Sequence, residues 1–157
     1  MQRPSNPAVI LARPLSSTAR RLIAGVMLLL YVLLIFGGSS GPAPGAITSL
    51  GLPDYLLHAA EFAVLGFLCS RWLLHLTLKT GIRVLVLIPM ALCALYGISD
   101  EIHQSFVPER DPAVADVLAD VVGSFIGALT YRMALLSHLG RTVGEGLSRS
   151  GGRSRRG

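Results

Sequence analysis

The chain contains four apolar segments, each close to the length that crosses a lipid bilayer. They cover residues 22–38, 55–74, 82–99 and 117–136. A helix rises about 1.5 Å per residue, so about 20 mostly apolar residues cross a hydrocarbon core about 30 Å thick. An open strand in lipid would leave backbone groups unpaired, so each segment is predicted to be a helix. The sequence therefore predicts an all-α, polytopic membrane bundle of four transmembrane helices within residues 20–137.

The composition agrees with a membrane location and excludes an ordinary soluble domain. Apolar residues make up 52% of the 157 residues and charged residues only 15%, whereas soluble domains carry about 25% charged residues. Cys69 and Cys93 both lie in apolar segments, so buried free thiols are expected rather than a disulfide. The length suits one compact unit.

Lysine and arginine residues fall almost entirely on one side of a four-helix topology. Thirteen of the fourteen lie before the first helix, around the turn between the second and third, or from the end of the fourth onward, and Arg110 is the exception. The positive-inside rule then places both termini in the cytoplasm and the protein in the cytoplasmic membrane. The net charge of +5 does not lie on an aromatic-rich soluble face, so no nucleic acid is expected as a partner.

The two ends are predicted to be cytoplasmic tails. Residues 1–19 precede the first helix, and residues 138–157 form a basic tail, rich in Gly, Ser and Arg, that is expected to be disordered. The basic tail is expected to attract anionic membrane lipids. A cleaved signal peptide is an alternative for the first segment, but its leader is long and Pro42 and Pro44 disfavour cleavage there. Pro89 should bend the third helix.

Acidic residues gather mostly at the opposite, outer end of the predicted bundle. Asp54, His58 and Glu61 are spaced i, i+4 and i+7, so they share one face of the second helix. Asp116 and Asp120 are spaced i, i+4 on the fourth helix. Charged groups in a membrane are costly and usually face a bundle interior or a water-filled cavity, so these faces indicate a common pocket.

Two further groups of residues extend this pattern. Asp100, His103 and Gln104 share a face where the third helix ends. Gly123 and Gly127 continue the acidic face of the fourth helix inward, and small residues at this spacing let a neighbouring helix approach closely. Three helices could thus direct polar faces toward one outward-opening site.

Each of these residues also has a structural interpretation. Asp54 could cap the second helix, and Asp116 could cap or begin the fourth. His58 and Glu61 could form a structural pair that holds two helices together. Residues 109–111 could be an ordinary solvated loop.

A divalent metal is a further alternative, because two histidines and several carboxylates suit zinc or a harder cation. The candidate ligands are His58, His103, Asp100 and Asp116. The sequence contains no HExxH motif, and a cluster of histidine and carboxylate groups also suits acid–base chemistry. No particular cofactor is therefore predicted.

Two stretches resemble a known family. The first runs from Ser99 to Arg110, SDEIHQSFVPER, and is followed by Asp116 and Gly123; the second covers residues 57–68, LHAAEFAVLGFL. Together they resemble the VanZ-like family over most of the chain outside its tails. The resemblance implies a small multi-pass protein of a bacterial inner membrane. The family's namesake is associated with resistance to teicoplanin, a glycopeptide that targets cell-wall precursors outside the membrane, and the resemblance implies no reaction.

The family motif carries over to nine positions of this chain. They are His58, Glu61, Asp100, Glu101, His103, Gln104, Arg110, Asp116 and Asp120. The family often has asparagine where this chain has Asp120, so an added carboxylate is the main departure from the pattern.

Three classes of function remain open at this stage. In the first, a binding or resistance-type envelope protein engages a lipid-linked precursor or a glycopeptide through Gln104, Arg110, Asp116 and Asp120, with Arg110 pairing to a phosphate or carboxylate. In the second, a membrane enzyme uses His58 or His103 as a general base, with Asp100, Glu101 or Glu61 orienting it or holding a metal. In the third, a transporter or proton relay would need an oligomer, whose state the sequence does not predict.

Overall fold

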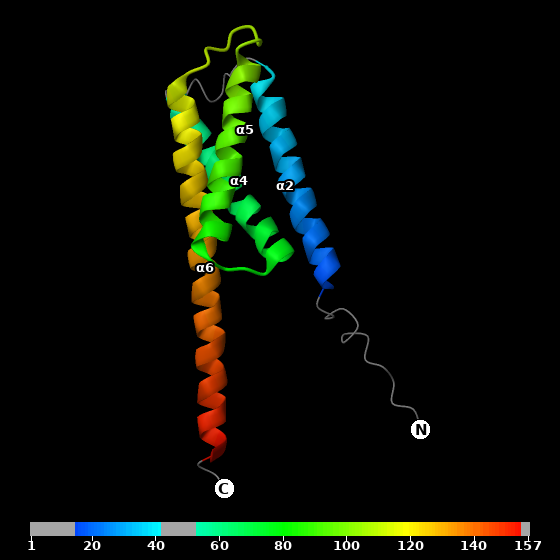
Figure 1. The fold of residues 1–157 in the computed structure, drawn as a ribbon, viewed down its shortest axis with the longest axis vertical. Helices are drawn as coiled ribbons and strands as arrows, with labels where there is room; N and C mark the ends of the chain where they lie inside the picture. The colour runs from blue at the N-terminus through cyan, green and yellow to red at the C-terminus, as the bar shows by residue number, and fades with distance from the viewer. Residues whose placement is uncertain (1–14, 42–52, 155–157) are drawn as a thin grey trace, which may run out of the picture.

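The computed structural model describes residues 15–41 and 53–154, and all of its regular structure is helical. The elements are α2 (Ser17–Ser39), α4 (Asp54–Thr77), the π-helix η1 (Arg83–Leu87), α5 (Ile88–Gln104) and α6 (Val114–Ser154). The π-helix continues directly into α5, which gives four long helical rods (Figure 1). All four are long and apolar enough to cross a membrane, so the predicted all-α architecture with four spans is confirmed.

The third and fourth helical rods extend beyond the predicted apolar segments, at the end of the bundle where α5 ends and α6 begins. The third rod ends at Gln104 instead of residue 99, and α6 begins at Val114 instead of residue 117. Asp100, His103 and Asp116 therefore lie on helices rather than in a loop. Hydropathy locates the apolar centre of a span and says little about its polar last turn, which explains the difference.

The prediction of a disordered tail from residue 138 differs from the structure, because α6 continues to Ser154. A polar segment of this kind would not nucleate a helix alone. Extending an existing helix requires no new nucleus, since each added residue contributes a hydrogen bond. Of the predicted tails, residues 1–14 and 155–157 lie outside the described residues, as does the 42–52 segment with Pro42 and Pro44.

The contact between α4 and α6 is the most extensive in the bundle, and it depends on residues with little or no side chain. A Cβ atom at Gly123 would collide with the carbonyl oxygen of Ala59, and one at Gly127 with the carbonyl oxygen of Ala63. A Cβ atom at Gly66 would collide with the backbone of Ser124. The predicted close approach at Gly123 and Gly127 is confirmed, and it brings the two backbones into contact.

The third rod is adapted to Pro89, which lacks a backbone N–H group. Pro89 follows the π-helical turn, in which the Ile88 N–H bonds to the carbonyl of Arg83, five residues earlier. The carbonyl of Leu85 lies four residues before the proline and would accept its missing N–H in an α-helix. The hydroxyl group of the fully buried Ser70 lies 2.8 Å from this carbonyl and 2.8 Å from the carbonyl of Gly66, so α4 supplies a donor that the two carbonyls share.

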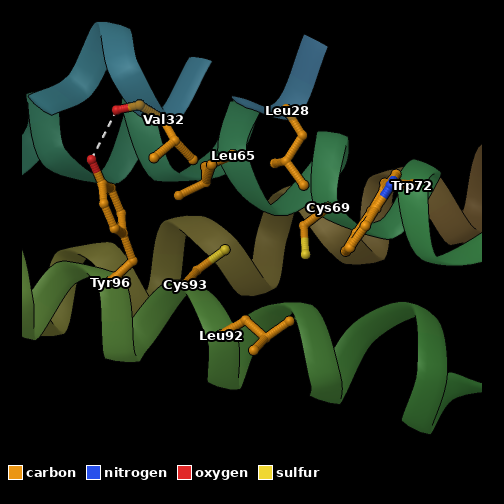
Figure 2. Close-up of a pocket in the computed structure, with 8 residues that line it drawn as sticks. All are labelled: Leu28, Val32, Leu65, Cys69, Trp72, Leu92, Cys93 and Tyr96. Atoms are coloured by element: carbon orange, nitrogen blue, oxygen red, sulfur yellow. Dashed lines mark hydrogen bonds between the residues drawn. The ribbon is translucent and has the colours of Figure 1, made fainter. Parts of the chain in front are cut away.

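An apolar groove of about 160 Å³ lies between α2, α4 and α5 (Figure 2). Its wall consists of aliphatic, aromatic and thiol side chains: Leu28, Val32, Leu65, Cys69, Trp72, Leu92, Cys93 and Tyr96. The Tyr96 hydroxyl donates to the carbonyl oxygen of Val32 over 2.9 Å, which ties α5 to α2 at one end of the groove.

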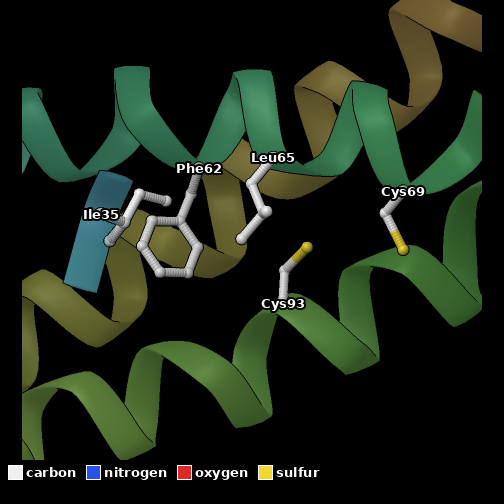
Figure 3. Close-up of a cluster of buried hydrophobic side chains, with 5 residues drawn as sticks. All are labelled: Ile35, Phe62, Leu65, Cys69 and Cys93. Atoms are coloured by element: carbon white, nitrogen blue, oxygen red, sulfur yellow. The ribbon is translucent and has the colours of Figure 1, made fainter. Parts of the chain in front are cut away.

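The buried apolar core overlaps this groove and joins α2, α4 and α5 (Figure 3). It contains Ile35, Phe62, Leu65, Cys69 and Cys93, with Phe62 fully enclosed. Both cysteines are free and buried, as expected from their apolar surroundings.

Helix α2 presents most of its apolar side chains outward. Leu34, for example, is 66% exposed, so lipid rather than protein would cover this face. Polar ties hold α2 along its length: the Arg21 Nε donates to the carbonyl of His75 over 2.8 Å, and the Tyr31 hydroxyl donates to the carbonyl of Glu61 over 3.1 Å. The first of these satisfies a free carbonyl in the last turn of α4.

We expect Gly127→Ala to weaken the bundle, because its methyl group would force α4 and α6 apart. Overpacking of this kind costs about 1–3 kcal/mol, and thermal unfolding of the purified protein in detergent would measure it. The matched control is Gly140→Ala on the same helix, where an added Cβ meets nothing within 4 Å. Equal melting temperatures for the two variants would contradict the role assigned to the contact.

Candidate functional site

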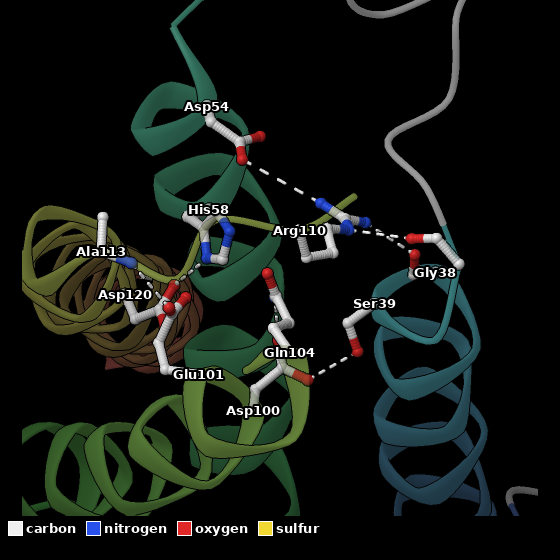
Figure 4. Close-up of polar contacts among 11 residues, drawn as sticks. Gly38, Ser39, Asp54, His58, Asp100, Glu101, Gln104, Arg110, Ala113 and Asp120 are labelled. Atoms are coloured by element: carbon white, nitrogen blue, oxygen red, sulfur yellow. Dashed lines mark hydrogen bonds and ion pairs between the residues drawn. The ribbon is translucent and has the colours of Figure 1, made fainter. Parts of the chain in front are cut away.

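Buried polar side chains gather where α2 and α5 end and where α4 and α6 begin (Figure 4). We call this the polar end of the bundle. Its buried members are Ser39, His58, Asp100, Glu101, Gln104, Asp116 and Asp120. The opposite end holds the first turn of α2 and the connection from α4 to η1 (Figure 1). The polar end thus draws residues from all four rods.

His58 and Asp120 form the most deeply buried pair. The Nδ1 atom of His58 lies 3.1 Å from the Oδ1 atom of Asp120, which is fully buried. Gly97 makes room for this carboxylate, because a Cβ there would collide with it. With the proton on Nδ1, His58 donates to Asp120 and its Nε2 atom is an acceptor. The predicted pairing of His58 with Glu61 is therefore wrong: Asp120 is the partner, and the Glu61 side chain is exposed.

Glu101 links the end of α5 to the start of α6. Its Oε2 atom accepts a hydrogen bond from the Ala113 N–H over 3.0 Å, immediately before α6 begins. Its Oε1 atom and the Oδ2 atom of Asp120 are buried and have no hydrogen-bond partner among the described residues. Buried polar atoms are nearly always paired, so these two carboxylate oxygens retain unused acceptor capacity in the site.

Asp100 joins α5 to the end of α2, and both of its carboxylate oxygens are engaged. Oδ1 accepts from the Ser39 hydroxyl over 2.6 Å, and Oδ2 accepts from the Gln104 side-chain amide over 2.9 Å. All three side chains are buried. Asp100 therefore acts in the structure as a connector between helices.

His103 lies on the α2 side of the polar end, apart from the His58 pair. Its Nε2 atom is 3.1 Å from the Ser40 hydroxyl, and its ring lies 4.7 Å from that of Phe36. The predicted meeting of polar faces thus occurs as two contact groups. The pair of His58 and Asp120 joins α4 to α6, with Asp116 beside it, whereas the second group, around Asp100, joins α5 to α2.

Arg110 ties the loop before α6 to the end of α2. Its Nε and Nη2 atoms donate to the carbonyls of Gly41 and Gly38 over 2.8 and 2.9 Å (Figure 4). Its Nη1 atom lies 4.0 Å from the Oδ2 atom of Asp54. A cation at carbonyls that end a helix is electrostatically favourable. These contacts use two donor atoms of the guanidinium group, and its pairing with a ligand anion stays a prediction.

Asp54 does not cap α4, as one interpretation of the sequence held. Pro53 occupies the cap position and Asp54 is the first helical residue, with no side-chain cap hydrogen bond. Asp116 lies in the first turn of α6, which agrees with the interpretation that it begins this helix. Ligand atoms of Asp54, His58 and Asp116 all lie within 4.8 Å of one another. Of the four metal-ligand candidates, the structure groups His58 and Asp116 with Asp54, and leaves Asp100 and His103 outside this group.

A chain of this architecture is a multi-pass membrane protein with a buried polar site at one end of its helices. The model of the VanZ/LLP1 family matches residues 19–136, and the protein belongs to this family. Comparison with curated proteins and with solved structures gave no match.

Sequence reasoning missed three parts of the site. Ser39 lies in the last turn of an apolar helix, where a serine gives no functional signal. The role of Gly97 as space for Asp120 was also missed, although its position one turn before Asp100 places a small residue on the polar face. The hydrogen bonds from Arg110 to the backbone carbonyls of Gly38 and Gly41 could not be predicted, because the spacing of side chains along a helix does not indicate contacts with backbone atoms.

We expect Ser39→Ala to loosen the attachment of α2, because it leaves Oδ1 of the buried Asp100 without its donor. An unsatisfied buried acceptor costs about 1–3 kcal/mol, measurable as a lower midpoint in detergent unfolding. Ser40→Ala is the matched control, since the Ser40 hydroxyl is exposed. The connector role of Asp100 would be wrong if Ser40→Ala destabilised the protein as much as Ser39→Ala.

Proposed function

We propose that this VanZ-family protein acts at the outer face of the cytoplasmic membrane on a lipid-linked cell-envelope precursor, and through it in teicoplanin-type glycopeptide resistance. The observation that carries the proposal is the burial of His58, Asp116 and Asp120 at one end of an otherwise apolar bundle. Ionisable groups in membrane segments are costly and mark functional sites by default.

The chemistry of a lipid-linked precursor fits two features of the bundle. Such a molecule has a polar head group and a long apolar chain. The polar end offers hydrogen-bonding groups near the ends of the helices, while the groove beside Leu28, Cys69 and Trp72 is lined mostly by apolar atoms.

The charge distribution supports an outward-facing polar end. Among the lysine and arginine residues whose side chains the structure describes, only Arg110 lies at the polar end. Those at or near the opposite end are Arg20, Arg21, Arg71, Lys79, Arg83, Arg132 and Arg141. Cations are retained on the cytoplasmic side during insertion.

We expect Glu109→Cys to react with a membrane-impermeant maleimide in intact cells. Both Glu109 and Lys79 are exposed, so Lys79→Cys is the matched control and should react only after permeabilisation. The native thiols of Cys69 and Cys93 are buried, so the unmodified protein should give little background. The reverse labelling pattern would show that the polar end faces the cytoplasm.

A membrane enzyme is the second candidate, and the pairing of His58 with Asp120 favours it. A carboxylate that holds one ring nitrogen orients the imidazole and stabilises its protonated form, which is how paired histidines act as general bases. The Nε2 atom of His58 would then receive the proton. Conversion of the bound lipid by the unmodified protein would favour catalysis, whereas recovery of the bound lipid unchanged would favour binding alone.

We expect the protein in nanodiscs to retain a polyprenyl-diphosphate-linked cell-wall precursor more strongly than phosphatidylglycerol in native mass spectrometry. His58→Gln should weaken this binding at least about tenfold, corresponding to 1.4 kcal/mol, because it breaks the pairing with Asp120. His103→Gln replaces a half-buried histidine at the same end and should bind normally.

The same variants test the resistance role. Expression of the unmodified protein in a susceptible bacterium should raise the teicoplanin concentration that stops growth, and His58→Gln should abolish the increase. Equal retention of both lipids, together with unchanged susceptibility, would overturn the proposal.

A further inference from the structure

We infer that Asp54, His58 and Asp116 bind a divalent transition-metal cation such as Zn²⁺ or Mn²⁺, with Asp120 orienting His58. The inference concerns the polar end but is independent of the proposed function, because the cation site is defined by these side chains without a lipid. The ligands differ from the four predicted from the sequence, because Asp54 joins His58 and Asp116 while Asp100 and His103 are left out. All three lie in the first two turns of α4 and α6.

The spacing of the three groups suits one ion. Their ligand atoms lie within 4.8 Å of one another. Nitrogen and oxygen ligands lie about 2.0–2.2 Å from zinc, so two ligands of one ion are at most about 4.4 Å apart. The Asp54 side chain is 52% exposed at the start of α4 and is free to make the small inward movement that binding requires.

Asp116 supplies an independent reason to expect a ligand. Its residue is only 6% exposed, yet its carboxylate makes no hydrogen bond and no ion pair with any described residue. Its backbone N–H bonds to the Ala113 carbonyl over 3.0 Å, which fixes its place in the first turn of α6. A largely buried carboxylate without a hydrogen-bond partner is costly, and the Oδ2 atom of neighbouring Asp120 is fully buried without a partner among the described residues. A cation between Asp116 and its two neighbours would provide that partner.

His58 is already oriented as a metal ligand. Its Nδ1 atom is held by Asp120, and within the described part of the chain no hydrogen bond involves Nε2. Metal-binding histidines commonly hold their second nitrogen against a carboxylate, which sets the tautomer and raises the basicity of the ligand nitrogen. Asp120 is fully buried and occupies the space that a side chain at Gly97 would fill. Its carboxylate therefore holds the His58 ring in a fixed position.

Arg110 is the one lysine or arginine side chain described at this end, and it does not block the site. Its closest approach to Asp54 is 4.0 Å, whereas its Nε and Nη2 atoms are held at 2.8 and 2.9 Å by backbone carbonyls. The carboxylates of Asp54, Asp116 and Asp120 outnumber this single charge. The remaining negative charge attracts a cation.

The ligand types select the class of metal. One imidazole with two carboxylates suits zinc or manganese, whereas magnesium and calcium prefer sites made only of oxygen. A bound ion of this kind could also contact a phosphate oxygen at the polar end.

The test uses the full-length protein in detergent, stripped with a chelator and free of added lipid. Isothermal titration with Zn²⁺ and elemental analysis after dialysis should give about one ion per chain for the unmodified protein. Asp54→Asn and Asp116→Asn should each lower the affinity at least about tenfold, and Asp120→Asn about 10- to 100-fold, as expected for loss of a carboxylate that orients a ligand.

His103→Gln and Glu109→Gln are the matched controls and should bind Zn²⁺ as the unmodified protein does. Zn²⁺ should also raise the melting temperature of the unmodified protein and not that of Asp116→Asn, because a ligand that binds only the folded state stabilises it. Asp54 is exposed, so Asp54→Asn tests the site without disturbing the fold. The inference is overturned if the unmodified protein binds no zinc, if Asp54→Asn binds it unchanged, or if His103→Gln loses it equally.

Because this experiment contains no lipid, its result is separate from that of the lipid-binding test. Metal binding without lipid retention would uphold the cation site alone. Lipid retention by a protein that binds no metal would uphold the proposed function alone.

Discussion

The structure depends on the backbone contact between α4 and α6. Gly66, Gly123 and Gly127 lie where any side chain would strike the opposite helix. In lipid there is little hydrophobic force to bring helices together, so close packing has to supply the attraction. The contact also sets the site, because it holds the first two turns of the two helices close enough for His58 to reach Asp120 over 3.1 Å.

A second constraint is that polar groups inside the membrane must find partners within the protein. The bundle meets it by exchanging donors between helices. Ser70 on α4 serves the carbonyl that Pro89 leaves without a donor, and Tyr96 on α5 serves Val32 on α2. At the polar end, the Glu101 carboxylate accepts a hydrogen bond from the N–H of Ala113, immediately before α6. The oxygens that remain without a described partner are therefore concentrated on the carboxylates of the site, where ligand chemistry is expected.

The sequence predicted the parts of the protein that follow from hydropathy and helical spacing. Four apolar segments indicated four spans, and the small residues at 123 and 127 indicated a close helix contact. The same spacing identified His58, Asp116 and Asp120 as members of one site. Their partners could not be predicted, because spacing along one helix does not give the rotation of the next. His58 therefore pairs with Asp120 instead of Glu61, and Asp54 joins the group in place of Asp100. The end of α6 was missed for a different reason: composition describes whether a segment folds alone, and this segment extends a helix that already exists.

The position of α2 has a consequence for how a membrane-dissolved molecule would reach the interior. This helix forms one wall of the apolar groove, and its outer face is largely exposed. It is joined to its neighbours by apolar contacts around Ile35 and by separate polar ties, at Arg21, Tyr31, Ser39, the carbonyl of Val32 and the carbonyls that accept from Arg110. By contrast, α4 and α6 are locked together along their backbones. Sideways displacement of α2 therefore requires the fewest contacts to be broken, and it would open the groove directly to the acyl chains of the bilayer. A lipid could then enter laterally, with its apolar chain never leaving the hydrocarbon phase.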